Sequence, residues 1–210
     1  MAFDFAAADH AVRPDIGAAM RRDWARLAAP GTWWSGFDRI AIAAEGRTAM
    51  FGTVAASPLA EPVGRVVRMV AADSPRIDAE WVATLPAEVD VPAYVEIIGI
   101  VARCSAVDFF HRALGLDLPE LPEPHGGEPS RRPPPDDVVV GKSFVPMVAP
   151  VSIPQTVSLV PPETEAWQDL SDATYMTFRD MERPDFSRAL HRTQIELVAA
   201  RTSQVNECFY

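Results

Sequence analysis

The stretch PAYVEIIGIVARCSAVDFFHRAL, residues 92–114, decides the fold of this chain. Its proline stands at the first position, and Gly99 is its one internal glycine. Apolar residues occupy most sides of the helix it would form, which predicts a central core helix. Gly115 follows directly and is a natural helix end. Because Cys104 lies inside this apolar segment, we expect a core residue there and not a reactive thiol.

Apolar residues at helical spacing predict further helices on both sides of this segment. Pro14 followed by Asp15 suits a helix start, and Pro30 with Gly31 ends the same helix. The other expected helices cover about residues 35–50, 62–72, 78–85 and 162–178, and a last one runs from 184 or 187 to 203. The sequence therefore predicts an all-α fold.

A proline-rich segment, residues 117–162, interrupts the helices and holds most of the 20 prolines. Continuous helix is excluded there, because proline lacks the backbone donor that a helix needs. We interpret 117–137 as an exposed, extended connection. The apolar part, 138–160, is expected to pack as an extended arm that could cover a neighbouring subunit. The predicted organisation is a helical half (1–116), the proline-rich connection, and a second helical half (163–210).

Composition narrows the classes of function. The chain has 210 residues, 48% hydrophobic and 23% charged, with a net charge of −10. An acidic surface repels phosphates, so neither nucleic acid nor an anionic membrane is an expected partner. The sequence contains no apolar run of roughly 18 residues and no basic leader, so we expect a cytoplasmic protein. Two cysteines also argue against a secreted disulfide scaffold.

The terminal segment IELVAARTSQVNECFY, residues 195–210, carries the candidate chemistry, because Glu196 precedes Cys208 by twelve positions. A thiolate, not a thiol, is the nucleophile in peroxide chemistry. Asn206 is a good N-cap residue, and a helix starting there would favour a thiolate through its N–H groups. Glu196 could accept the thiol proton as a general base. The pattern therefore predicts Glu196 and Cys208 as catalytic residues.

This segment resembles the motif of the alkylhydroperoxidase D-like / carboxymuconolactone decarboxylase superfamily. In that motif a Glu is followed, after eleven residues, by a Cys, two residues, a second Cys, three residues and a His. Glu196 matches the Glu and Cys208 the first Cys. The second Cys and the His would fall beyond Tyr210, so we expect a C-terminally shortened chain. The stretch WWSGFDRIAIAAEGRTA, residues 33–49, is also similar to a helix of family members.

The resemblance implies an all-helical fold, a homo-oligomer and no cofactor or metal. It implies the reduction of small hydroperoxides through a Cys pair that a thiol-containing reductant protein restores. Cys208 would then be the resolving cysteine, while the attacking cysteine would be the second one of the motif. Residues 1–210 alone are therefore expected to show little turnover with alkyl hydroperoxides.

Two alternatives come from other classes of protein. The decarboxylase branch of the superfamily acts on a lactone without relying on the Cys pair, and Glu196 with His191 would then do acid–base work. A non-catalytic helical assembly protein would use the proline-rich arm for oligomer contacts. His111 and His191 have no metal-ligand companions at helical spacing, so we expect them to be structural or surface residues. Trp33 and Trp34 are expected to be packing anchors.

Overall fold

The computed structural model describes residues 3–52, 58–140, 143–150, 152 and 155–206. The chain divides into two compact units, Met1–Leu170 (unit 1) and Ser171–Tyr210 (unit 2), and each is described by itself. Among the described residues, eight α-helices account for nearly all regular structure, and the strands form one short hairpin. The predicted mainly helical class is confirmed.

Unit 1 contains the helices expected before the proline-rich segment and the first part of the one after it. They are α1 (Pro14–Ala28), α2 (Gly36–Phe51), α3 (Glu61–Ala72), a 3-10 turn (Ser74–Arg76), α4 (Ala79–Ala83), α5 (Val91–Ala113) and α6 (Pro161–Thr174), of which α6 continues into unit 2. Pro14 occupies the first turn of α1, as predicted. Ser35 caps α2 through a reciprocal pair with Asp38, and the Asp90 side chain caps α5.

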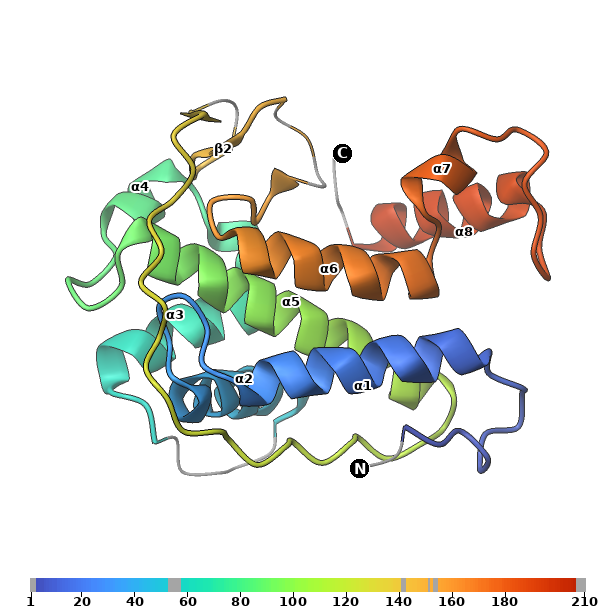
Figure 1. The fold of residues 1–210 in the computed structure, drawn as a ribbon, viewed down its shortest axis with the longest axis horizontal. Coiled ribbons are helices and arrows are strands. Elements are labelled where there is room, and N and C mark those ends of the chain that lie inside the picture. Colours follow the sequence, from blue (N-terminus) through green and yellow to red (C-terminus); the bar gives the residue numbers. More distant parts are fainter. Residues whose placement is uncertain (1–2, 53–57, 141–142, 151, 153–154, 207–210) are drawn as a thin grey trace. The chain divides into compact units, whose positions relative to one another are not determined.

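Helix α5 is the centre of unit 1, and α1, α2 and α3 all pack against it (Figure 1). The core that surrounds it includes Ile97 and Ile100, both fully buried. Cys104 is also buried, which confirms the prediction of a core residue. Although α5 is long and apolar, neither it nor any other described helix could cross a membrane.

The segment 117–137 contains neither helix nor strand and runs alongside α1, as Figure 1 shows. Backbone groups hold it there. The Trp24 Nε1–H donates to the Glu120 carbonyl (2.9 Å), and the His125 N–H donates to the Ala28 carbonyl (2.7 Å). The predicted extended connection is therefore present, but it is attached to the helices along its length.

The apolar part of the proline-rich segment packs on this chain's own core. It begins with an antiparallel hairpin of β1 (Val138–Val139) and β2 (Met147–Val148), in which Val138 lies opposite Val148. The residues of this part that join the core cluster of unit 1 are Val145, Val157, Leu159 and Val160. The expectation of an arm laid over a neighbouring subunit is therefore wrong for these side chains, because unit 1 already buries them.

Unit 2 holds the end of α6, the short α7 (Phe178–Met181) and α8 (Arg192–Val205). The prediction of one helix to residue 178 was wrong. Helix α6 ends at Thr174, and the Thr177 side chain caps α7. The last helix also begins later than expected, because the His191 side chain caps it. A threonine side chain that bonds the backbone favours a helix start over a helix interior, which fits the position of Thr177 before α7.

Candidate functional site

Glu196 lies on α8 and is held by a tyrosine that follows α6. The Tyr175 hydroxyl donates a hydrogen bond of 2.8 Å to Oε2 of Glu196. The Nε atom of Arg192, one turn earlier on α8, lies 3.8 Å from Oε1. The Glu196 side chain is nevertheless 43% exposed. The carboxylate is thus positioned from two sides and remains accessible from solvent.

The protonation state of Tyr175 allows it to act as a lasting hydrogen-bond donor to Glu196. Burial, followed by the hydrogen bond to Glu196, raises the pKa of Tyr175 to about 12. At neutral pH the phenol is therefore protonated and remains a donor to the carboxylate. A carboxylate held by a permanent donor keeps its orientation, as a positioned base requires.

Cys208, the predicted partner of Glu196, lies in 207–210, outside the described residues. Asn206, expected at the start of a new helix, is instead the C-cap of α8. Its N–H donates to the Thr202 carbonyl over 3.0 Å. The predicted approach of Cys208 to Glu196 therefore stays a prediction.

Cys104, the other cysteine of the sequence, has a thiol of low reactivity. Burial, with the neighbouring Asp23 carboxylate adding to it, raises the pKa of the Cys104 thiol to about 12. Cys104 is therefore a thiol at neutral pH and a poor nucleophile.

His111 and His191 both make structural contacts. The His111 ring packs edge-on against Phe3, and its Nδ1 lies 2.8 Å from the Val107 carbonyl oxygen. The structural role expected for His111 is confirmed. His191 accepts a hydrogen bond from the Thr193 N–H at the start of α8. Its ring is thus engaged in capping a helix.

A buried ion network in unit 1 was not predicted from the sequence. Its members lie on four helices and are almost completely buried: Asp23 on α1, Arg39 on α2, Glu96 and Arg103 on α5, and Glu163 on α6. The sequence does carry one signal for the network: Glu96 and Arg103 stand in an apolar helix, and a buried charge needs a partner. Nothing in the helical spacing indicated where those partners were.

Glu163 is the centre of this network. Its Oε1 accepts from Arg39 over 2.9 Å, and its Oε2 accepts from Arg103 over 3.0 Å. Arg39 also donates to Glu96 in a very close contact. Asp23 is bound less well. Its Oδ1 lies 3.0 Å from Nε of Arg103, but the two atoms are not aligned for a hydrogen bond.

Three carboxylates against two guanidinium groups leave one negative charge in excess. Burial raises the pKa of Asp23 and of Glu96, and the arginines oppose this only in part. Burial also acts to raise the pKa of Glu163, but Arg103 and Arg39 together outweigh it, so the pKa is lowered. The arginines therefore compensate the negative charge of Glu163, and the excess negative charge falls on the Asp23 and Glu96 carboxylates.

Two glycines make room for the carboxylates of the network. A Cβ atom at Gly99 would collide with Oε2 of Glu163, and one at Gly31 would collide with Oε1 of Glu96. Gly31 directly precedes two backbone N–H groups, those of Thr32 and Trp33, which donate to Oε2 of Glu96 over 3.1 and 2.7 Å. The network is thus built into the helix packing and into the turn before α2.

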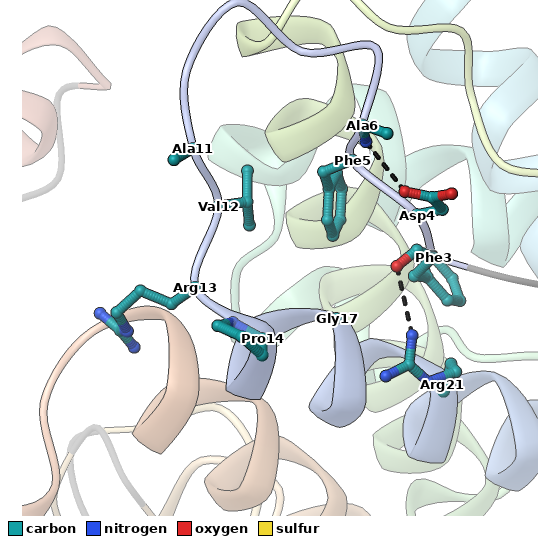
Figure 2. Close-up of a pocket in the computed structure, with 10 residues that line it drawn as sticks. All are labelled: Phe3, Asp4, Phe5, Ala6, Ala11, Val12, Arg13, Pro14, Gly17 and Arg21. Atoms are coloured by element: carbon teal, nitrogen blue, oxygen red, sulfur yellow. Dashed lines mark hydrogen bonds between the residues drawn. The ribbon is translucent and has the colours of Figure 1, made fainter.

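A pocket of about 440 Å³ lies beneath the N-terminal segment of unit 1 (Figure 2). Figure 2 shows this segment looping from Phe3 to Pro14, with Arg21 of α1 donating to the Phe3 carbonyl over 3.2 Å. The Asp4 carboxylate is engaged by the Ala6 N–H. No cysteine or histidine lines this pocket. In the part of the chain that the structure describes, no cluster of side chains is arranged to hold a metal ion.

Comparison of the chain with protein-family models, curated proteins and solved structures found no match. The family resemblance of the terminal segment therefore stays a prediction.

Proposed function

We propose that this chain is a thiol-dependent, alkylhydroperoxidase-like protein in which Glu196 is the base for Cys208. The observation that supports it is the hydrogen bond from Tyr175 to Glu196. A half-exposed carboxylate fixed by a neutral phenol can accept a proton from an adjacent group. The proposal also depends on the resemblance of the terminal segment to the alkylhydroperoxidase D-like family.

The proposed chemistry uses a hydroperoxide as oxidant and a thiol protein as reductant. The attacking cysteine of the pair takes one peroxide oxygen, becoming a sulfenic acid and releasing an alcohol. Glu196 removes the proton of Cys208, and the resulting thiolate attacks the sulfenic sulfur. A disulfide forms and hydroxide leaves, and hydroxide takes the proton from Glu196 to become water. The reductant then reopens the disulfide.

This scheme assigns Cys208 to the resolving step. In the motif that the terminal segment resembles, the attacking cysteine stands three positions after the resolving one, and residues 1–210 do not include that position. Residues 1–210 are therefore expected to reduce alkyl hydroperoxides no faster than a Cys208→Ser control. Turnover that depends on Cys208 in this same chain would overturn the assignment of roles.

The proximity of base and thiol can be tested without turnover, through the pH dependence of alkylation by iodoacetamide. Cys104 supplies little background, because its pKa of about 12 keeps it protonated. Glu196→Gln removes a negative charge beside Cys208, so the midpoint of the alkylation profile is expected to move to lower pH. The matched control is Glu182→Gln, which neutralises an exposed glutamate of the same unit and should leave the midpoint unchanged.

Two results would contradict the proposal. One is a Glu196→Gln profile that coincides with the unsubstituted chain, which would mean that the carboxylate is remote from the thiol. The other is an equal shift in both variants, which would mean that only the net charge of the unit matters. A lactone-directed activity that survives Cys208→Ser would instead favour the decarboxylase alternative.

A further inference from the structure

A second pocket of unit 1, of about 310 Å³, lies where three segments meet. These segments are the turn before α2, the loop that leads into α5, and the proline-rich segment. Trp33 and Trp34 line it from the first segment, Glu88 from the second, and Glu128 and Arg131 from the third. Its volume is at the lower end of the range for small-molecule sites.

The face of Trp33 already carries a cation. The guanidinium carbon of Arg131 lies 5.5 Å from the centroid of the Trp33 ring, within the range of a cation–π contact. Among the described residues, the Arg131 side chain has no ion pair, although Glu128 lines the same pocket. Trp33 is therefore more than the packing anchor that the sequence suggested.

The backbone of Arg131 is strained in this position. Its φ is +50°, and it is the one non-glycine residue with positive φ in the described part of the chain. The Arg131 N–H donates to the Thr32 carbonyl over 2.9 Å, which fixes the conformation directly beside Trp33. Strain of this kind persists where the surroundings impose it, and it often marks a functional position.

Two of the four carboxylates in the pocket are unpaired. Asp38 accepts hydrogen bonds from Ser35, and Asp90 accepts from the Ala93 N–H at the start of α5. Glu88 and Glu128 make no hydrogen bond or ion pair with any described residue. After the capping aspartates are set aside, the pocket therefore offers an indole face, two unpaired carboxylates and one guanidinium.

We propose that this pocket binds a small organic cation, an alkylammonium or alkylguanidinium compound. The charge lies over the Trp33 ring, and Glu88 and Glu128 balance it. Arg131 occupies the same ring face when no ligand is bound, so it competes with the ligand. The net charge of −10 on the chain favours the approach of a cation. This proposal is independent of the thiol chemistry of unit 2.

Isothermal titration with butylguanidinium chloride, at constant ionic strength, tests the proposal directly. Butylguanidinium is expected to bind, while the neutral, similarly sized 1-pentanol should not. The double variant Glu88→Gln/Glu128→Gln should weaken binding by about tenfold, and Trp33→Leu should weaken it by a similar factor. Thermal unfolding of each variant shows whether it remains folded, and the two glutamine changes are on the rim, outside the core.

Arg131→Gly is the decisive variant. It removes the competing guanidinium and replaces a strained residue with one that tolerates positive φ, so folding is not at risk. Butylguanidinium should bind this variant several-fold more tightly than the unsubstituted chain, and Arg131→Lys, which keeps a cation, should show no such gain. Equal affinity of Arg131→Gly and the unsubstituted chain would overturn the competition. Binding of 1-pentanol as strong as that of the cation would overturn the charge-based site.

Discussion

Gly99 on α5 and Gly46 on α2 are both interior helix residues, but their missing Cβ atoms face different surroundings. At Gly99 a Cβ would collide with the Glu163 carboxylate. At Gly46 the nearest atom would be Cγ2 of Val101, at an ordinary contact distance of 3.5 Å. The same substitution should therefore act in opposite directions at the two positions.

We predict that Gly99→Ala lowers the free energy of unfolding by at least about 1–3 kcal/mol, because it displaces a buried carboxylate from its arginines. Gly46→Ala should instead raise it by roughly 0.5–1 kcal/mol, because alanine is the better helix residue. Urea titration followed by circular dichroism measures both values. A Gly99→Ala chain as stable as Gly46→Ala would mean that Glu163 moves aside without cost.

For single residues, the residue type and its neighbours in sequence predicted the burial of some side chains and failed to predict that of others. Cys104 was correctly assigned to the core, because most residues of α5 around it are apolar. Glu96 and Glu196 stand in similar segments, yet Glu96 is fully buried among arginines and Glu196 is half exposed beside Tyr175. The difference depends on residues distant in sequence, such as Arg39 and Tyr175, which local spacing does not indicate.

Helix boundaries were predicted accurately where the sequence carries strong start and stop residues, and less accurately elsewhere. Helix α5 was predicted well because Asp90 caps it, Pro92 stands in its first turn and Gly115 follows it with a φ of +69°. The end of α6 was not predicted, because no proline or glycine stands there. Instead the Thr177 side chain starts α7 by accepting from the Asp180 N–H, which is a weaker signal in a sequence.

The buried ion network joins α1, α2, α5 and α6, so its titration affects the association of these helices. A carboxyl group whose pKa is raised by folding holds a proton longer in the folded state than in the unfolded chain. Its contribution to stability is therefore greatest at low pH and declines as the pH rises above the ordinary value of 3.8 for aspartate. Asp23 belongs to this class.

We predict that Asp23→Asn reduces the loss of stability between about pH 4 and pH 8, because it removes the excess charge of the network. Asp169→Asn is the control for which the opposite pH dependence of stability is expected. Arg22, through its hydrogen bonds, lowers the pKa of Asp169, so this carboxylate stabilises the fold above pH 4 and stops doing so as the pH falls. Denaturant midpoints measured from about pH 2 to pH 8 should therefore depart from those of the unsubstituted chain in different windows, above about pH 4 for Asp23→Asn and below about pH 4 for Asp169→Asn. Parallel curves for the two variants would contradict the proposed charge balance.

On the scale of the whole chain, the proline-rich segment belongs to unit 1 and not to a linker. Its prolines correctly excluded helix, but composition did not reveal that the apolar part lies in the core. Val157, Leu159 and Val160 are buried against residues that come much earlier in the chain. Contacts of this kind have no periodic signature, so they could not be predicted from a single sequence.

Deleting residues 117–160 should therefore unfold unit 1, because four valine and leucine side chains leave the core and each contributes about 1.5–3 kcal/mol. The expected result is a loss of cooperative thermal unfolding by circular dichroism. A deletion that stays folded but changes only its size in gel filtration would support the assembly-protein alternative. A milder matched change, Leu159→Ala, should lower the unfolding free energy by about 2–5 kcal/mol while leaving the chain folded.

The burial of Cys104 also has a practical consequence for handling the protein. Of the two cysteine thiols in residues 1–210, that of Cys104 is enclosed by the helices and is shielded from dissolved oxygen and copper ions. In a sample of residues 1–210, ageing in air can therefore link molecules by disulfides only in pairs, through Cys208. A non-reducing gel of an old sample should show a band at twice the mass and no ladder above it.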